Sequence, residues 1–293
     1  MMSLAVLVDT TKCIGCRSCQ VSCKQWNGLP AERTHIEGRD TGYQNPLSLS
    51  SHTYTMVSFR EIAEPTAPGG FKRVFAKRQC MHCEEPSCVS ACPVTALRKT
   101  AEGPVIYDSN KCMGCRYCVW ACPFGVPTAD WDSLTPVIRK CTMCFDRITG
   151  HMEIADLNGQ PVAAEARERY AAGGKTPACV KACTTGALRF GNRDDLLKTA
   201  WERVRAMPDR YVQHVYGEHE VGGTSFLYLA AVPFEKAGFR HDLGTHAPPE
   251  YSSIALSLVA PAAMGLGALL TAVYMLQQRK IKLAEAPAPA EKE

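Results

Sequence analysis

The longest apolar stretch of the chain lies near its C-terminus. Residues 254–276 carry no charged side chain over 23 positions. At about 1.5 Å of rise per residue, a helix of this length crosses a hydrocarbon core of about 30 Å. The alternative is a buried core helix, but apolar runs in such helices are usually shorter. The pattern therefore predicts one transmembrane helix that crosses a lipid bilayer.

The charges around this segment predict its orientation. Three basic residues follow it directly, and the nearest charges before it are acidic. The basic residues are Arg279, Lys280 and Lys282, and the acidic residues are Asp242 and Glu250. Under the positive-inside rule, the C-terminus lies in the cytoplasm and the rest of the chain lies on the other side. Residues 277–293 then form a cytoplasmic tail, in which alternating Ala, Pro, Glu and Lys predict disorder.

Shorter patterns in the rest of the chain predict strands and helices. Residues 4–8 form an apolar run typical of a buried strand, and residues 54–59 alternate as a half-buried strand does. Asp194 and Asp195 can cap a helix whose apolar stripe is more typical of core packing than of docking to a partner. That stripe consists of Leu197, Ala200, Trp201 and Val204. A charged helical piece and a further strand are expected at residues 163–170 and 224–232.

Sixteen cysteines define the chemistry of the chain, because all of them fall into four runs of nearly the same spacing. The runs are Cys13-x2-Cys16-x2-Cys19-x3-Cys23, Cys80-x2-Cys83-x4-Cys88-x3-Cys92, Cys112-x2-Cys115-x2-Cys118-x3-Cys122 and Cys141-x2-Cys144-x34-Cys179-x3-Cys183. Bacterial ferredoxins use this run: three thiolates hold one cubane, and the fourth reaches the neighbouring cubane. Four runs of four predict four [4Fe–4S] clusters with iron bound through all sixteen cysteines.

Two other uses of the cysteines fit the sequence less well. A disulfide scaffold is typical of short secreted chains with more than roughly 8–10% cysteine, and this chain has 16 cysteines in 293 residues. Zinc sites use two separated CxxC pairs and do not need the third and fourth cysteines of each run. The spacing therefore favours iron–sulfur clusters over both disulfides and zinc.

The exchange of the last cysteine between paired runs defines four ligand sets. Runs two and three are adjacent, as in a two-cluster ferredoxin, so runs one and four pair across them. Set 1 is Cys13, Cys16, Cys19 and Cys183; set 2 is Cys23, Cys141, Cys144 and Cys179; set 3 is Cys80, Cys83, Cys88 and Cys122; set 4 is Cys92, Cys112, Cys115 and Cys118.

The expected fold class is α+β, with two nested ferredoxin-like [4Fe–4S] modules and one C-terminal transmembrane helix. The outer module is split and the inner module is inserted into it. The boundaries are 1–35 and 136–192 for the outer module, 72–130 for the inner module, 193–250 for a linker or docking region, 254–276 for the membrane helix and 277–293 for the tail.

Several residues near the runs carry secondary expectations. A lysine precedes the first cysteine of three runs and would favour the reduced state of a cluster, unless it is solvated and screened. These lysines are Lys12, Lys111 and Lys140. Nearby aromatic residues are expected to pack and exclude water, namely Trp26, Tyr117 and Trp120. His82 is expected to be structural, because cysteines already fill every ligand position.

The residues around the clusters resemble the iron–sulfur (beta) subunit of membrane-bound respiratory formate dehydrogenase. The resemblance begins with Cys13-Ile-Gly-Cys-Arg-Ser-Cys-Gln-Val-Ser-Cys-Lys-Gln-Trp-Asn27 and covers nearly the whole chain. It continues through Asn45-Pro46, Cys80-Met-His-Cys83, Cys122-Pro-Phe-Gly-Val-Pro127 and Val221-Gly-Gly-Thr224. Val89-Ser-Ala-Cys-Pro93 and the run from Cys112 to Pro123 are similar to the subunit of membrane-bound nickel–iron hydrogenases.

The resemblance implies a place in a membrane complex. A large molybdenum- or tungsten-bis-pterin catalytic subunit would oxidise formate, this chain would relay the electrons, and a cytochrome b subunit would pass them to quinone. The resemblance also implies the inner (cytoplasmic) membrane, with the cluster domain periplasmic and the C-terminus cytoplasmic. The chain has no N-terminal signal peptide or twin-arginine pair, which fits subunits of this family that are exported with their catalytic partner.

Other functions are weighed against this one. The same relay in a nickel–iron hydrogenase is the nearest alternative, and a membrane-anchored structural or sensory metal protein is an alternative of another class. No nucleophile, general base or pterin site is evident, so we interpret the chain as a non-catalytic subunit of an oxidoreductase complex. The net charge of +4 is small and mixed, which argues against nucleic acid as a partner.

Overall fold

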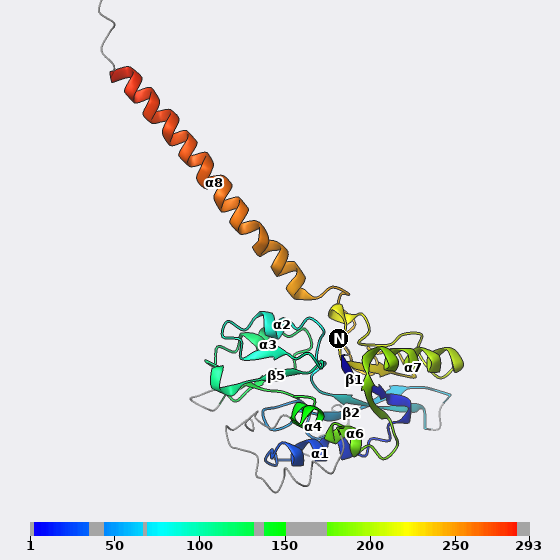
Figure 1. Cartoon of the computed structure of the whole chain (residues 1–293). Helices are drawn as coiled ribbons and strands as arrows, with labels where there is room; N and C mark the ends of the chain where they lie inside the picture. The colour runs from blue at the N-terminus through cyan, green and yellow to red at the C-terminus, as the bar shows by residue number, and fades with distance from the viewer. Residues whose placement is uncertain (1–2, 35–43, 67–68, 132–137, 151–174, 286–293) are drawn as a thin grey trace, which may run out of the picture. The chain divides into compact units, whose positions relative to one another are not determined.

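The computed structural model describes residues 3–34, 44–66, 69–131, 138–150 and 175–285 of the chain. The chain divides into two compact units, residues 1–247 and the C-terminal segment from Pro248 onward. The expected helical piece at residues 163–170 lies outside the described residues. Figure 1 labels the elements of both units, which are described separately below.

A three-stranded sheet forms the centre of the first unit. Strand β1 (Leu4–Asp9) lies between β8 (Leu188–Asn192) and β9 (Phe226–Leu229), antiparallel to β8 and parallel to β9. Successive β1 side chains point to opposite faces of the sheet, and both faces are covered. Ala5 and Leu7 join one hydrophobic cluster, and Val6 and Val8 join the other. This double burial explains why the predicted strand is an unbroken apolar run.

Helix α7 (Arg193–Ala206) covers one face of this sheet. Of the predicted stripe, Ala200 and Val204 are buried, and Leu197 and Trp201 are partly buried against the same cluster, so the stripe serves packing, as expected. Leu196, outside the predicted stripe, is also buried. The cap differs from the prediction, because the Asn192 side chain accepts hydrogen bonds from the amides of Asp194 and Asp195 at 2.9 and 3.4 Å. The two aspartates lie in the first turn. Since α7 and β9 belong to the core, residues 193–247 are part of the folded unit rather than a linker.

A hairpin stands between the cysteine runs. Strand β2 (Met56–Ala63) pairs antiparallel with β3 (Phe71–Arg78), with Met56 opposite Arg78. The end of the hairpin that holds Met56 and Val57 is buried, while the other end is exposed. The half-buried strand predicted over residues 54–59 is wrong in its start and in its burial, because β2 begins at Met56 and residues 54–58 are all buried.

Short helices and ribbons carry the cysteines. The helices are α1 (Ser18–Trp26), α2 (Ser87–Ser90), α3 (Tyr117–Ala121), α4 (Phe145–Thr149) and α6 (Ala178–Lys181). The ribbons are β4 (Leu97–Lys99) with β5 (Val105–Tyr107), and β6 (Thr128–Ala129) with β7 (Ile138–Arg139). Single 3-10 turns are η1 (Thr10–Lys12), η3 (Ser109–Lys111) and η4 (Glu220–Gly222). Helix α1 packs against α6, and α2 packs against α3, so each pair joins two different runs.

The last two cysteines of a run share one helix only in the first run. Cys19 and Cys23 both lie in α1, whereas α2 and α3 end before Cys92 and Cys122. Cys92 and Cys122 precede prolines, and a residue before proline is disfavoured in helical conformation. The i, i+4 spacing would let both cysteines lie on one face of a helix, but in these runs they do not. In the fourth run α6 also ends before Cys183, although no proline follows.

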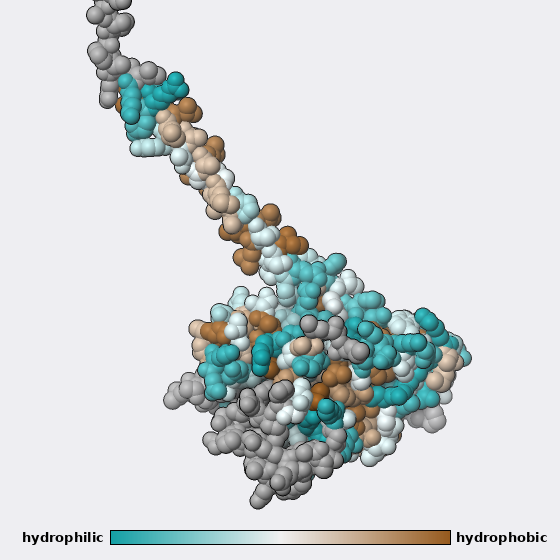
Figure 2. Space-filling model, in the orientation of Figure 1, coloured by the Kyte–Doolittle hydropathy of each residue, from teal (hydrophilic) through white to brown (hydrophobic). Residues whose placement is uncertain are grey.

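The second unit is helix α8 (Pro248–Glu285). It has a mean hydropathy of 1.9 in its most apolar window, and by length and composition it can cross a membrane. Figure 2 shows apolar residues along this helix and hydrophilic residues toward its C-terminal end. The helix is longer than the predicted 254–276 segment at both ends. Residues 277–285 are therefore helical, and only 286–293 of the expected disordered tail lie outside the described residues.

Candidate metal centres

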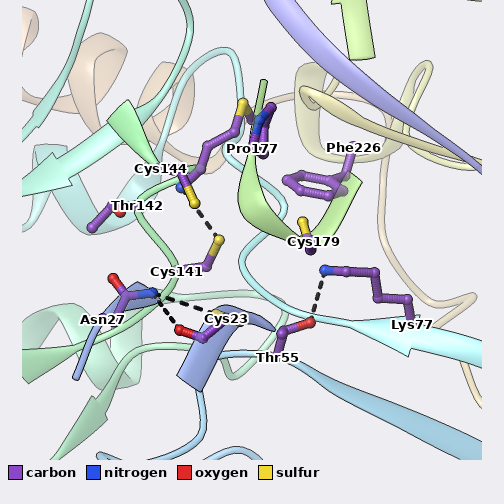
Figure 3. Close-up of a pocket in the computed structure, with 11 residues that line it drawn as sticks. Cys23, Asn27, Thr55, Lys77, Cys141, Thr142, Cys144, Pro177, Cys179 and Phe226 are labelled. Carbon is purple, nitrogen blue, oxygen red and sulfur yellow. Dashed lines mark hydrogen bonds between the residues drawn. The ribbon is translucent and has the colours of Figure 1, made fainter. Parts of the chain in front are cut away.

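The four cysteines of set 2 line one cavity. Cys23 comes from α1, Cys179 from α6, and Cys141 and Cys144 from the loop that leads into α4. Figure 3 shows these side chains gathered around the cavity with Lys77 and Phe226. Segments from three distant parts of the sequence thus place four thiols around one space.

The four cysteines of set 4 line a second cavity. Cys92 follows α2, Cys112 and Cys115 lie in the loop before α3, and Cys118 lies in α3 itself. The rest of the lining is mainly apolar and includes Leu97 and Ile138. The packing of α2 against α3 brings the two runs together here.

Sets 1 and 3 are gathered in the same way, as the mutual electrostatics of their thiols show. The pKa of Cys13 is raised by burial and by negative charge on Cys16 and Cys183. The pKa of Cys83 is raised well above its ordinary value by burial and by charge on the other three cysteines of set 3. Those cysteines are Cys80, Cys122 and Cys88.

Neighbouring sets also lie close to one another. Beyond the effect of burial, negative charge on Cys179 of set 2 raises the pKa of Cys19 of set 1. In the same way, charge on Cys80 of set 3 raises the pKa of Cys141 of set 2. Charge on Cys118 of set 4 in turn raises the pKa of Cys88 of set 3. The sets therefore form a series in the order 1, 2, 3, 4. Of the sixteen cysteines only Cys16 and Cys115 are exposed, and they belong to the two end sets.

One backbone turn recurs in all four runs. The residue before the second cysteine has a positive φ each time, at Gly15 (71°), His82 (50°), Gly114 (75°) and Met143 (57°). At Gly15 an added Cβ would lie 2.9 Å from the Phe75 ring, so only glycine fits there. The turn directs amides at sulfur: Gly114 N–H donates to Cys112 Sγ (3.4 Å), and Met143 N–H donates to Cys141 Sγ (3.3 Å). Such donors stabilise thiolates that are bound to metal.

The thiols themselves need a metal to ionise. Burial raises the pKa of Cys19, Cys88 and Cys118 to about 12, and that of Cys141 to about 11. Iron supplies the positive charge that makes a buried thiolate stable, because ligand thiols lose their protons on binding.

A single zinc ion would need its sulfurs close together. Zn–S bonds of about 2.3 Å hold sulfurs roughly 3.8 Å apart in a tetrahedron. In the part of the chain that the structure describes, no three His, Cys, Asp or Glu side chains converge closely enough for one metal ion. The cysteines of sets 2 and 4 instead each line a cavity, and four thiolates around one space are the ligands that a cubane requires.

Two lysines are buried beside the cysteine sets, and the sequence pattern singled out only one of them. Lys140 is 2% exposed and donates to the carbonyls of Val105 and Cys141, so it is not the solvated lysine weighed above. Lys77 is also 2% exposed and lines the set 2 cavity. It lies on β3, three residues before Cys80, where an alternating strand pattern gives no sign that a lysine is buried. Lys111, in contrast, is exposed and pairs with Asp108.

Of the remaining expectations, those for His82 and Trp26 fit the structure, and those for Tyr117 and Trp120 do not. His82 is buried, and its Nδ1 accepts a hydrogen bond from Val105 N–H at 2.8 Å, which fits a structural role. Burial and nearby lysines hold its pKa well below 6.5. Trp26 donates to Asp146 Oδ2 at 2.8 Å and packs, as expected. Tyr117 and Trp120 do not exclude water, because they lie on the outer side of α3 and are 63% and 81% exposed.

Comparison with known proteins agrees with this geometry. Residues 12–96 and residues 71–169 each match a family described as a 4Fe-4S dicluster domain. A protein of Nitratidesulfovibrio vulgaris is 41% identical over 96% of this chain and 69% of its own length. The nitrate-inducible formate dehydrogenase iron-sulfur subunit of Escherichia coli is 35% identical over 77% of this chain and 67% of its own length. The hydrogenase-2 operon protein HybA of Escherichia coli O157:H7 is 34% identical, over 80% and 71% respectively.

The cysteine sets and the two dicluster matches define an iron–sulfur protein built for electron transfer, with ferredoxin-like domains in an α+β fold. Its relatives are more specific. The chain belongs to the family of formate dehydrogenase iron–sulfur subunits, to which HybA is also closely related.

Proposed function

We propose that this chain is the electron-transfer subunit of a membrane-bound formate dehydrogenase. It relays electrons through four [4Fe–4S] clusters, from a molybdenum- or tungsten-pterin catalytic subunit to a membrane cytochrome b and quinone. The observation that carries the proposal is the series of four cysteine sets with an exposed cysteine at each end. The identity with formate dehydrogenase subunits supports the choice of substrate.

Each set would hold one cluster with the ligands proposed from the spacing. The cysteines of set 2 line one cavity, and those of set 4 line another. Within set 1, and likewise within set 3, charge on neighbouring thiols raises the pKa of a cysteine of the same set. Nesting of the two modules is supported by the pairing of β1 with β8 and of α1 with α6, since these join the start of the chain to the fourth run. The inner pair, α2 with α3, lies between them in sequence.

The protein holds the four sets in a fixed order and keeps water away from them. When bound, the clusters would supply one-electron transfer along the series. The chain places neighbouring sets near enough that charge on Cys179 affects Cys19 and charge on Cys118 affects Cys88. Burial of the inner cysteines keeps water and oxidants away, which limits electron loss along the series.

The two ends have distinct surfaces for two partners. Around Cys16 the exposed apolar residues are Ile14 and Val21, both on the first run. Close to Cys115 in the sequence they are Met113, Tyr117 and Trp120, and the exposed Trp131 ring contacts Arg116, next to Cys115. Aromatic residues with an exposed apolar face are typical of interface cores. We assign one end to the electron donor and the other to the acceptor.

Helix α8 anchors the chain in the inner membrane. Its length and composition fit a bilayer, and the basic residues after the apolar segment favour a cytoplasmic C-terminus with the cluster unit in the periplasm. External protease on intact spheroplasts should then digest the cluster unit and spare a tag fused after Glu293. Protection of the cluster unit and digestion of the tag would reverse the orientation.

The complex that contains this chain tests the assignment. Anaerobic purification from membranes should give at least sixteen iron atoms per chain beyond the haem iron of the cytochrome b, as four cubanes require. A brown absorbance that bleaches on reduction should accompany a catalytic subunit that transfers electrons from formate to dye. Iron for fewer clusters would refute the count, and zinc without visible absorbance would favour the structural metal protein. Reduction of dye by hydrogen but not by formate would favour the hydrogenase relay, which the identity with HybA supports as the second candidate.

A further inference from the structure

Lys77 is a buried cation in direct reach of two cysteine sets. Its side chain enters the set 2 cavity from β3, as Figure 3 shows, and is 2% exposed. Its positive charge favours the thiolate form of Cys23 and Cys141 of set 2 and of Cys19 of set 1, which lowers the pKa of these thiols against the larger rise that burial causes. Burying an ammonium group is unfavourable unless something compensates its charge.

The partners of Lys77 position the ammonium group without neutralising it. Nζ donates to Thr55 Oγ1 at 2.7 Å and to Gln79 Oε1 at 2.8 Å, and it lies 5.3 Å from the centre of the Phe226 ring. All three partners are uncharged. Within the described residues Lys77 forms no ion pair with a carboxylate. The compensating negative charge therefore comes from the cysteine sets.

The positioning network is rigid and itself buried. Gln79 Nε2 donates to Tyr228 Oη at 2.6 Å, and Tyr228 O–H donates to the Lys77 carbonyl at 2.9 Å. Gln79 is 3% exposed, Thr55 2% and Tyr228 0%. A lysine held at this many points does not swing out to solvent, so its charge stays beside set 2.

We propose that Lys77 sets the reduction potential of the cluster held by set 2, raising it, and raises that of set 1 to a smaller extent. This inference rests on the proposed function. Reduction adds one electron from the reductant to the cluster, breaks no bond, and leaves the proton on Lys77. The added negative charge is stabilised by a fixed cation in a medium of low dielectric. Because the cation is buried, dissolved salt screens it little.

Redox titration of the anaerobically purified complex, followed by electron paramagnetic resonance, tests this role. The signal of set 2 is identified as the one lost or altered in Cys144→Ser. In Lys77→Met, which keeps the length of the side chain and removes its charge, the midpoint of that signal should fall. The midpoint of set 1 should fall less, that of set 4 should stay unchanged, and the iron content should equal that of the wild type. The shift should persist at high ionic strength.

Lys72→Met provides the matched control, because Lys72 is an exposed lysine on the same strand. It should leave every midpoint unchanged. If Lys77→Met fails to load iron, Gln79→Glu decides, since it places a carboxylate 2.8 Å from Nζ and should also lower the set 2 midpoint. If the variant that loads full iron has the same set 2 midpoint as the wild type, the role of Lys77 is overturned and the relay remains intact. A wild-type complex without four clusters overturns the relay itself.

Discussion

Cys19 and Cys23 share helix α1 yet face different cysteine sets. The charge of Cys13 and Cys16 acts on Cys19, whereas Cys23 lines the cavity with Cys141. One helical turn separates the two sulfurs along the axis, so one short helix serves two sites. The two positions therefore give a matched pair of substitutions.

Cys23→Ser should damage the set 2 cluster and spare the set 1 cluster, although Cys23 belongs to the first run. Cys19→Ser should do the opposite. Electron paramagnetic resonance of each reduced variant, with iron analysis, distinguishes the two losses. Loss of the same signal in both variants would show that the ligands are not exchanged between runs.

His214 and Glu220 should make stability depend on pH. His214 Nε2 lies 2.8 Å from Glu220 Oε1, and Gly217 N–H donates to Glu220 Oε2 at 2.6 Å. The hydrogen bond to Glu220 raises the pKa of His214 above 6.5. Burial opposes ionisation of Glu220, but hydrogen bonds from His214 and Gly217 lower its pKa below 4.5.

The signs define a pH window for this pair. The contribution of Glu220 is present above pH 4.5 and is lost as pH falls through its lowered pKa. The contribution of His214 is complete below pH 6.5 and is lost as pH rises through its raised pKa. The thermal midpoint of His214→Gln should therefore fall most, relative to wild type, between these values. Because His214 is half-exposed, the pair should contribute about 1 kcal/mol or less. His219→Gln, at a 71% exposed histidine side chain, is the control, and an equal loss at all pH values in His214→Gln would contradict the pairing.

At the scale of elements, each short helix ends where its local sequence and its neighbours allow. Helix α1 continues past Cys23 to Trp26, while α3 ends before Cys122, whose extended backbone precedes Pro123. The end of α6 has no such local cause, and the pairing of the following strand, β8, with β1 fixes the chain direction there. Helix α7 begins at a cap that also ends β8, so Asn192 links a strand and a helix.

Asn192→Ala should destabilise the first unit by about 1 kcal/mol, because it removes the acceptor for two helix amides. Asp194→Ala should cost only a few tenths of that, since an exposed acidic residue in the first turn acts only through the helix dipole. The thermal unfolding midpoints of the anaerobic proteins rank the two variants. A larger loss for Asp194→Ala would restore the aspartates as the caps.

At the scale of the molecule, the cluster unit and the membrane helix are separate structural units. Truncation before Ser252 should leave the iron content and the formate-to-dye activity intact, because the residues of all four sets lie in the first unit. In the proposed complex, transfer from formate to quinone should collapse, since the helix would hold the relay at the membrane where the cytochrome would accept electrons. Truncation after Glu285 is the control and should retain both activities. Undiminished quinone reduction without the helix would leave it with no role in the transfer.

The sequence by itself determined the chemistry of the protein. Thiolate spacing is a local property, because a loop that wraps a cubane needs its cysteines two or three residues apart, and this pattern can be recognised without a structure. The membrane helix was equally evident, since its length and lack of charge follow from the bilayer alone. The strand at residues 4–8 and the stripe of α7 were predictable from periodicity for the same local reason.

Tertiary structure decided what depends on residues far apart in the chain. The order of the sets follows from the proximity of residues such as Cys141 and Cys80, and this depends on how helices and loops pack. The turns at His82 and Met143 repeat those at Gly15 and Gly114, but without glycine nothing in the sequence marks them. Lys77 lies three residues before Cys80 on an alternating strand, where a lysine normally faces solvent. Only the packing of β3 between the sheet and the cysteine loops buries its charge beside set 2, because burial is set by neighbours that the local sequence does not contain.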